Sequence, residues 1–322
     1  MKLYENIGYK LGLRCRAVMN NVLYHPFHAH KSDFEIICVL NGKLKLSNSA
    51  VDYDLQSGDV YFLNPEEPHR LFSDQPNIVL TIHFSMAEFP ELFDDSMIPP
   101  PYYICDSFLL QETKNAPDLL YLRFLLAKIY TEYTREKPSE IKLRNTFDSL
   151  ITLLLEQFRA YYYINATGFG YELTRKPIDS LTINDYTVYD IVHNVIYKEY
   201  ATKLNLEKLA LDYHVSESAL SRMIKKSIGI TFTEMLTLAR CEEAERLLAD
   251  TNKNLNDVAL DVGFSNRKHL TTMFKKWYQK TPGEFRKGIQ YDLKNSAQIY
   301  VAPFDHEKAK DILEQYLDQY WF

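Results

Sequence analysis

Apolar and polar residues alternate in seven short segments between residues 14 and 85. Turn-forming pairs such as Asn41-Gly42 and Ser57-Gly58 separate the segments. Period-two alternation is typical of β-strands with one buried face, and several short strands at this spacing predict an antiparallel sandwich or barrel. The predicted strands cover residues 14–25, 34–40, 42–48, 51–55, 59–64, 69–72 and 77–85.

After the predicted strands, the spacing of apolar residues changes to that of a helix. Apolar residues recur every three or four positions in residues 119–136 and 141–163, which predicts two long antiparallel helices joined at Pro138. A small barrel would not cover both apolar stripes, so we expect a homodimer through residues 105–163, although the pair could equally pack only on the barrel. Residues 165–187 are weakly periodic and are interpreted as a linker.

One pattern then occurs twice, about fifty residues apart. Each copy predicts a short helix, a tight turn and a second helix with a polar outer face, which is a helix-turn-helix. A helix of this kind fits the DNA major groove. The first copy contains Leu209-Ala210, Ser216, Leu220 and Lys225-Lys226, and the second contains Val258-Ala259, Ser265, Leu270 and Lys275-Lys276.

The second helix of each unit is the candidate recognition helix, capped by Ser216 in the first copy and Ser265 in the second. Arg suits guanine and Asn suits adenine, while Ser and Thr contact base edges or phosphates. Residues 233–248 predict a connecting helix of about 24 Å, which can hold the two recognition helices roughly one DNA turn apart. The outward, candidate DNA-binding residues are Ser218, Ser221, Arg222, Lys225, Asn266, Arg267, Lys268, Thr271, Thr272 and Lys275.

The charge distribution supports this interpretation more than the net charge of −6 does. Residues 190–290 carry 16 Lys and Arg against 13 Asp and Glu, whereas the rest carries 21 against 30. Residues 266–280 contain five basic residues and no acid, although helix faces usually mix both signs. The pattern favours a surface that contacts phosphates.

Composition excludes several other classes of protein. No apolar run approaches the roughly 20 residues that span a bilayer, and the first residues show no secretory signal, so we expect a cytoplasmic protein with no membrane partner. The four cysteines lack paired spacing, which argues against a zinc finger or a disulfide framework. We expect no enzyme and no cofactor.

Residues 190–290 resemble the DNA-binding domain of the AraC/XylS family of transcription regulators. Two positions depart from the family pattern: His214 stands where a small residue is frequent, and Gln279 stands where glycine is usual. Both affect turn geometry rather than the DNA-facing side. The resemblance rests on Leu206, Leu209-Ala210, Val215-Ser216, Leu220-Ser221-Arg222, Lys225-Lys226, Gly229, Phe232, Arg240, Ala244, Leu247-Leu248, Val258-Ala259, Val262-Gly263-Phe264-Ser265, Phe274-Lys275-Lys276 and Thr281-Pro282-Gly283-Glu284-Phe285-Arg286.

The N-terminal region resembles the two cupin motifs, through His28-x-His30, Glu35, Gly42, Gly58-Asp59 and Pro65-x-x-Pro68-His69. The resemblance implies that His28, His30, Glu35 and His69 share one pocket, and in cupin enzymes such a set holds a metal. In regulators of this kind the barrel commonly binds an organic effector, so the four residues could instead bind a polyhydroxylated ligand or form a structural network. Tyr24, Tyr61 and His83 are weaker candidates for the pocket or for the core.

We therefore predict a multidomain α+β protein. Its parts are a cupin-like effector-binding β-barrel (1–104), a helical dimerisation region and linker (105–187), an all-α double helix-turn-helix domain (188–290) and a C-terminal extension (291–322), which we expect to dock back on the protein. The expected partners are a double-stranded DNA operator, a small-molecule effector and, for an activator, RNA polymerase. We expect a sugar as effector, with a fatty acid or another metabolite second. The alternatives are a cupin metalloprotein fused to a DNA-binding module and an architectural DNA-binding protein without an effector.

Overall fold

The computed structural model describes residues 4–48, 52–90, 102–105, 115–167, 170–177, 180–295 and 300–319. The chain forms two compact units, one made of residues 160–292 and the other of residues 4–94, 102–159 and 293–322. This grouping differs from the four predicted parts, because residues 160–187 join the helix-turn-helix unit and the C-terminal extension joins the barrel unit. No helix within the described ranges combines the length and the apolar character that crossing a membrane requires.

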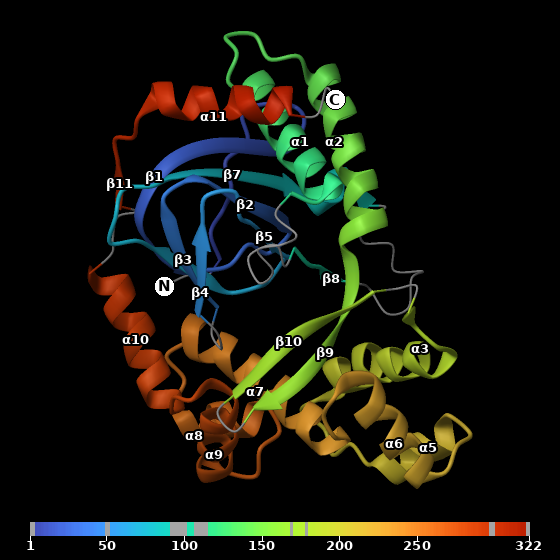
Figure 1. The fold of residues 1–322 in the computed structure, drawn as a ribbon. Helices are drawn as coiled ribbons and strands as arrows, with labels where there is room; N and C mark the ends of the chain where they lie inside the picture. The colour runs from blue at the N-terminus through green and yellow to red at the C-terminus, as the bar shows by residue number, and fades with distance from the viewer. Residues whose placement is uncertain are drawn as a thin grey trace. The chain divides into compact units, whose positions relative to one another are not determined.

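The barrel unit is built on a nearly closed antiparallel β-barrel, as predicted (Figure 1). The strands are hydrogen-bonded in the order β4-β3-β6-β1-β7-β2-β5, and the long strand β1 also pairs with β11. The seven predicted strands are all present. They are β1 (Cys15–His28), β2 (Asp33–Asn41), β3 (Lys43–Asn48), β4 (Asp52–Gln56), β5 (Val60–Leu63), β6 (His69–Phe72) and β7 (Ile78–Ser85). The short strand β8 (Tyr102–Tyr103) is not part of this sheet and belongs to a separate three-stranded sheet.

Three helices cover one side of this barrel in Figure 1: α1 (Pro117–Tyr133), α2 (Glu140–Leu153) and α11 (His306–Asp318). Leu122, Leu126, Phe147 and Leu150 are fully buried in one apolar core with residues of β1, β2 and β7. The apolar stripes that suggested a dimer are thus largely covered within the same chain.

The C-terminal extension docks back on the barrel unit, as expected. Strand β11 (Tyr300–Ala302) pairs antiparallel with β1, with Val301 opposite Val22. The side chain of Asn21 donates to the carbonyl of Pro303 at 3.2 Å. Ala309 and Leu313 of α11 are buried in the core shared with α1 and α2.

The prediction of a helix over residues 141–163 is wrong beyond Leu153. A π-helical turn follows at Leu154–Phe158, and β9 (Arg159–Thr167) then pairs with β10 (Gly170–Pro177) as a hairpin. The aromatic run of three tyrosines from Tyr161 to Tyr163 favours a strand, and strand pairing outweighs the helical spacing of its apolar residues. The residues interpreted as a linker therefore contain regular structure.

The hairpin packs onto the helices of its own unit through Tyr189 of α3 (Ile183–Asp190). The Tyr189 ring stacks on Tyr161 with a centroid distance of 4.4 Å. Its hydroxyl lies 3.1 Å from the carbonyl oxygen of Tyr162 and 3.2 Å from that of Ser227. Lys176 of β10 forms an ion pair with Asp185. These contacts make residues 160–177 part of this unit.

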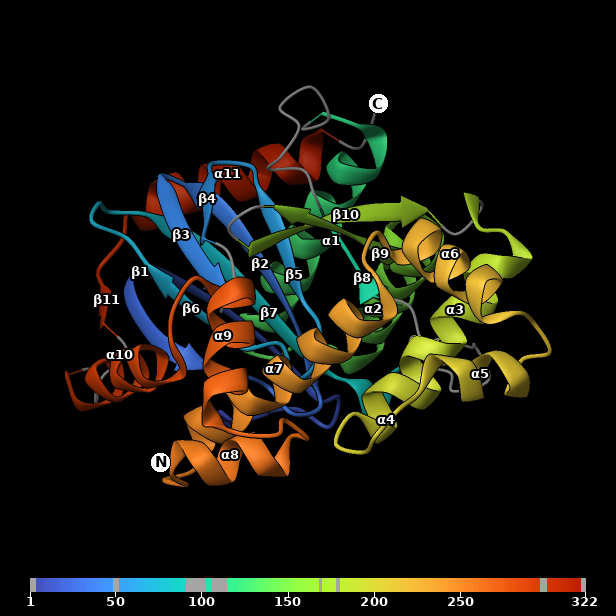
Figure 2. The same ribbon diagram turned by 90° about the horizontal axis from the view of Figure 1, so that it is seen from below.

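The rest of this unit is helical, and the helix-turn-helix pattern is as predicted. Figure 2 shows α7 running between the two helix pairs. At 1.5 Å per residue, the 19 residues of α7 span about 28 Å. A π-helical turn at Ile191–Ile196 leads into α4 (Tyr197–Glu199), and the further helices are α5 (Leu206–Asp212), α6 (Glu217–Ile228), α7 (Phe232–Asp250), α8 (Leu255–Asp261), α9 (Arg267–Tyr278) and α10 (Pro282–Asn295).

Candidate functional site

Four residues from three parts of the barrel unit converge at one end of β1. His28 ends β1, His30 follows it, Glu35 lies in β2 and His69 begins β6. All four are buried, and each offers a ligand atom within 4.8 Å of the others. Glu35 Oε2 lies 3.0 Å from His30 Nε2 and 3.1 Å from His69 Nε2. The structure thus brings together the four residues that the cupin resemblance selected.

His83 joins this group, and two residues that the sequence did not single out extend it. His83 lies opposite Glu35 across β7 and β2, with its Nε2 3.5 Å from Glu35 Oε1. Glu5 Oε2 lies 3.5 Å from Nε2 of both His25 and His28. The backbone N–H of Glu5 donates to the carbonyl of Ala29 at 2.9 Å, which fixes this segment beside β1.

The Glu35 carboxyl and the imidazole of His69 shift each other's pKa. Burial opposes ionisation of Glu35, but His83, His69 and His30 outweigh it and hold the pKa of its carboxyl well below the usual range. Burial also disfavours a charged His69, yet Glu35 raises the pKa of that imidazole. Burial lowers the pKa of His25 to about 3 and that of His28 well below its usual value. The result is an ionised Glu35 paired with His69, while His25 and His28 stay neutral.

This donor set fits two kinds of ligand. Imidazole nitrogen and carboxylate oxygen suit Fe, Mn, Ni or Zn, and His28, His30, Glu35 and His69 would supply the ligand atoms. The same groups can donate and accept hydrogen bonds to hydroxyls of an organic ligand. Orientation of His69 is fixed in either case, because its Nδ1 lies 3.1 Å from the carbonyl oxygen of Glu67.

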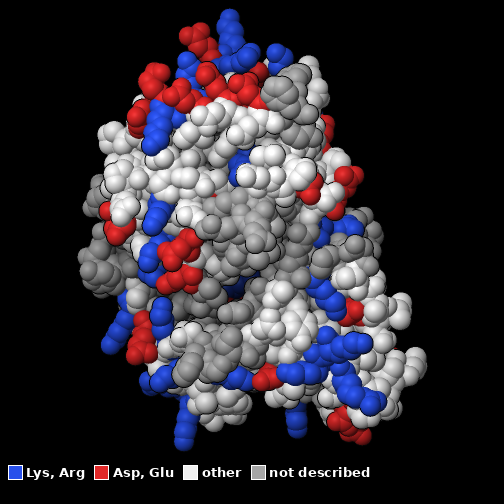
Figure 3. Space-filling model, in the orientation of Figure 1, with Lys and Arg blue, Asp and Glu red and all other residues white. Residues whose placement is uncertain are grey.

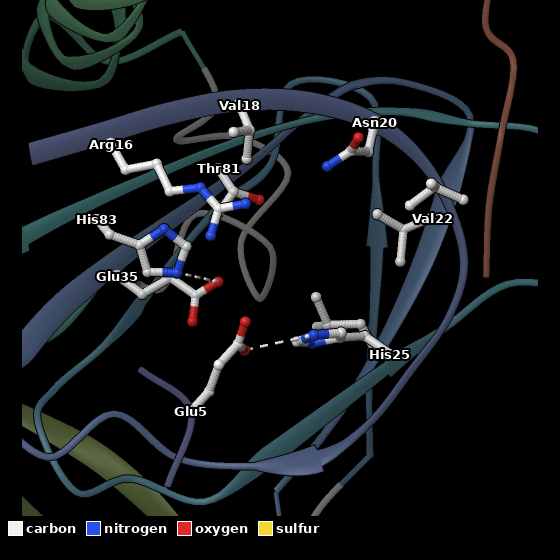
Figure 4. A pocket seen from close by; sticks show the side chains of 11 residues that line it. Glu5, Arg16, Val18, Asn20, Val22, His25, Glu35, Thr81 and His83 are labelled. Carbon is white, nitrogen blue, oxygen red and sulfur yellow. Dashed lines mark ion pairs between the residues drawn. The ribbon is translucent and has the colours of Figure 1, made fainter. Parts of the chain in front are cut away.

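A small pocket that is partly open to solvent adjoins the histidine cluster (Figure 4). The β1 residues in its wall follow the alternation of the strand, because Arg16, Val18, Asn20 and Val22 share one face. The full lining is Glu5, Arg16, Val18, Asn20, Val22, His25, Glu35, Leu71, Thr81, His83 and Val301.

Tyr24 and Tyr61, the two weaker aromatic candidates, do not line this pocket. Tyr61 is buried in a separate apolar core, 5.3 Å from the ring of Tyr53. Tyr24 is half-buried in β1, opposite Phe72 of β6. The structure therefore groups His83 with the four cupin-like residues and places both tyrosines elsewhere.

The second candidate site consists of the outer faces of α6 and α9. Arg222 and Lys225 are exposed on α6, and Arg267, Lys268 and Lys275 are exposed on α9. Lys and Arg side chains project from the lower edge of the molecule in Figure 3, where these helices lie in Figure 1. Ser218, Asn266 and Thr272 are also exposed, whereas Ser221 and Thr271 are half-buried.

Several polar groups on these helices already have a local partner. Asn266, not Ser265, caps α9, since its side chain accepts the backbone N–H of His269 at 2.9 Å. The hydroxyl of Thr271 donates to the carbonyl of Arg267, and that of Thr272 to the carbonyl of Lys268. Their oxygens can still accept a further hydrogen bond, so both threonines remain able to contact DNA.

The sequence family described as the AraC-like ligand binding domain matches residues 10–154, and the helix-turn-helix domain family matches residues 209–288. One match lies in each unit, and together they span more than half of the chain. The chain belongs to the AraC family of transcription regulators.

Relatives of this AraC-family chain include an uncharacterised HTH-type transcriptional regulator of Staphylococcus aureus, 24% identical over 248 residues that cover 77% of this chain and 30% of that protein. The bifunctional transcriptional activator/DNA repair enzyme AdaA of Bacillus subtilis is 38% identical over 97 residues, covering 30% and 46% of the two chains. The solved C-terminal domain of the response regulator yesN from Fusobacterium nucleatum is 34% identical, with a TM-score of 0.29; the match covers 31% of this chain and 98% of that one. The chain thus spans only about 30% of the length of the Staphylococcus relative.

Several residues that line the pocket of this AraC-family barrel were not predicted from the sequence. The neighbouring residues would have allowed some of them to be predicted and not others. Arg16 and Asn20 alternate with the core residues Cys15, Ala17 and Met19, so the period of β1 could have placed them on the opposite face. His25 lies three residues before His28 and could have been grouped with it. Glu5 has no such signal, because only the folded barrel brings it to the cluster.

Proposed function

We propose that this protein is a sequence-specific DNA-binding transcription regulator whose barrel binds a small-molecule effector. One observation carries the DNA-binding part: two helix-turn-helix pairs share one compact unit, and each presents an exposed polar and basic second helix. A connecting helix of about 28 Å approaches the roughly 34 Å of one DNA turn. A single chain can then contact two adjacent major grooves of an operator.

The pocket supports a polar effector, with a sugar as first choice. Asn20, Thr81 and Glu5 offer hydrogen-bonding groups, while Val18 and Val301 offer apolar surface for the C–H face of a ring. A fatty acid is the second choice, and it would need a longer apolar channel than this mixed lining provides. Effector binding in the barrel would change the affinity of the DNA-binding unit for its operator, which is allosteric coupling.

A cupin metalloprotein fused to a DNA-binding module is the alternative, and the four convergent ligand atoms favour it. Metal analysis of the purified full chain separates the two. A stoichiometric transition metal that survives dialysis supports the metalloprotein, whereas its absence supports an organic effector.

Two finer parts of the proposal concern assembly and output. Dimerisation through residues 105–163 would place two DNA-binding units on one operator, and Ile141 of α2, which is 74% exposed, is available to a partner. For an activator, RNA polymerase is the further partner. Transcription from an operator-bearing promoter, measured with and without effector, distinguishes activation from repression.

The decisive experiment is selection of DNA sequences by the full chain from a random pool. A regulator enriches a defined site and binds it at least about a thousandfold more tightly than random DNA. Enrichment of no sequence by a folded protein contradicts the proposal, and uniform binding to all DNA supports the architectural alternative.

A further inference from the structure

Arg16 is the cation in the wall of the barrel pocket. It is half-buried on the pocket face of β1, and Figure 4 shows its guanidinium pointing into the pocket near His83. Arg16 lies opposite His83 across β1 and β7, and His83 lies opposite Glu35 across β7 and β2. The three residues therefore form one row across three neighbouring strands.

The two carboxylates of the pocket already have histidine partners, whereas Arg16 has no carboxylate partner. Glu35 lies within 3.5 Å of His30, His69 and His83, and Glu5 lies 3.5 Å from His25 and His28. Over the described part of the chain, no carboxylate oxygen lies within 4.0 Å of the Arg16 guanidinium. A half-buried guanidinium facing a pocket favours an anion from the ligand.

The other lining residues restrict the rest of that ligand. Thr81 lies beside Arg16, and Asn20 lies further along β1; both can bind hydroxyl groups of the ligand, and Glu5 can accept hydrogen bonds from its hydroxyls on the opposite side. Val18, Val22 and Val301 provide apolar surface along the same wall. A compact ring or short chain that carries several hydroxyls and one anionic group matches this lining.

We propose that the effector is a sugar acid whose carboxylate binds Arg16. The planar guanidinium matches a carboxylate through two parallel hydrogen bonds. A phosphate fits less well, because its second negative charge would face Glu5 and Glu35 across a small pocket. This inference rests on the proposed function, since it names the class of effector for the same barrel.

The test compares sugars that differ only at the acidic group. Calorimetry on the full chain would measure binding of D-galacturonate and D-glucuronate against D-galactose and D-glucose. We expect at least one acid to bind ten- to a hundredfold more tightly than its neutral counterpart, the range typical of a charge-assisted pair.

Substitution then assigns that preference to one side chain. R16Q should reduce binding of the acid to the level of the neutral sugar, and R16K should retain part of the preference. The matched control is R14Q, because Arg14 lies two residues earlier, is exposed and pairs with Glu88 outside the pocket. Thermal unfolding without ligand checks that the variants remain folded.

Three outcomes overturn the inference: equal affinity for acid and neutral sugar, no binding of either acid, or an acid preference that survives in R16Q. Sequence selection on the same preparation separates this result from the proposed function. A protein that enriches an operator but shows no acid preference refutes only the sugar acid, whereas one that enriches no sequence refutes the regulator.

Discussion

His214 and Gly263 occupy equivalent turns in the two helix-turn-helix units, and both have left-handed backbone, with φ of 56° and 85°. The next residue donates an equivalent backbone hydrogen bond in each unit, from Val215 to Ala210 at 2.9 Å and from Phe264 to Ala259 at 2.8 Å. The turn geometry is therefore kept although one copy lacks the glycine that favours it. Gln279, with φ of 58°, repeats this relationship against Gly229 at 93°.

The left-handed residues predict stability changes of opposite sign for substitutions to glycine and away from glycine. H214G and Q279G should each raise the free energy of unfolding by about 1 kcal/mol, because glycine adopts positive φ without steric cost. G263A should lower it by more, since its Cβ would also lie 2.7 Å from the carbonyl oxygen of Ala201. Urea unfolding, followed through the buried Trp277 in a W321F background, measures the free energy of unfolding of the three variants. No gain in H214G and Q279G would refute the strain argument.

Arg222 and Lys275 should affect DNA binding in different ways. R222A should cost roughly 1–3 kcal/mol on the selected operator and relax the preference at one base pair, if Arg222 contacts a guanine. K275A should weaken binding to all sequences and reduce the salt slope by about one. K128A, an exposed lysine on α1 in the barrel unit, is the control. Equal losses for R222A on operator and random DNA would show that Arg222 contacts phosphate only.

Glu245 should make the helix-turn-helix unit less stable as the pH rises. Burial raises the pKa of this carboxyl to about 8, against about 4.5 for an ordinary glutamate. The folded chain holds more protons than the unfolded chain between these values, so stability falls with pH across that window. E245Q removes this penalty and should gain roughly 2–4 kcal/mol at pH 8 and little at pH 4.5, measured by urea unfolding.

The contrasting control is Glu234 of the same helix. Burial opposes its ionisation, but hydrogen bonds from Thr231 and Lys276 lower the pKa of the Glu234 carboxyl to about 2. Its contribution is present above about pH 4.5 and is lost as the pH falls toward 2. E234Q should therefore cost roughly 1–2 kcal/mol at pH 7 and almost nothing near pH 2. The same pH profile for both variants would contradict the two assignments.

His30 and Glu35 should be required for the response to effector and dispensable for DNA binding. H30A or E35A should abolish the effect of effector on transcription and leave operator affinity nearly unchanged, because the histidine cluster and the recognition helices belong to different compact units. Metal content of the wild type and both variants would be measured in parallel. Loss of operator binding in a folded variant would contradict the separation of the two sites.

The full chain should sediment as a dimer at micromolar concentration. Residues 105–163 are the predicted interface, and I141E, which places a charge on an exposed apolar position of α2, should shift the equilibrium toward monomer. L211E is a matched control, since Leu211 is 70% exposed on α5, outside this region. A monomeric wild type at that concentration would remove the proposal.

Elements whose signal is local could be predicted from the sequence. The strands of the barrel follow from period-two alternation, as in Cys15, Ala17 and Met19 of β1, and turn residues mark their ends. Helices α5 to α9 follow from the repeat and from the cap at Ser216. The convergence of His28, His30, Glu35 and His69 came from the cupin resemblance, because spacing alone does not bring separate strands together.

Elements whose partner lies far along the chain could not be predicted. The three residues of β11 are too few for a periodic signal, and they pair with strand residues nearly 280 positions earlier. Tyr161 to Tyr163 could belong to a helix or a strand by spacing, and β10 together with Tyr189 decides for the strand. Glu5 reaches His25 and His28 only after the barrel has formed.

The return of the chain to β1 through β11 makes the DNA-binding unit an insertion within the barrel unit. Domain exchange between this protein and other regulators must then replace residues 160–292 as an internal cassette with two junctions. A chimera with one junction near residue 159 would leave the edge of β1 unpaired, remove Val301 from the pocket and expose the face of α1 that α11 covers. Such a hybrid would therefore lose part of the barrel unit along with the original DNA-binding unit.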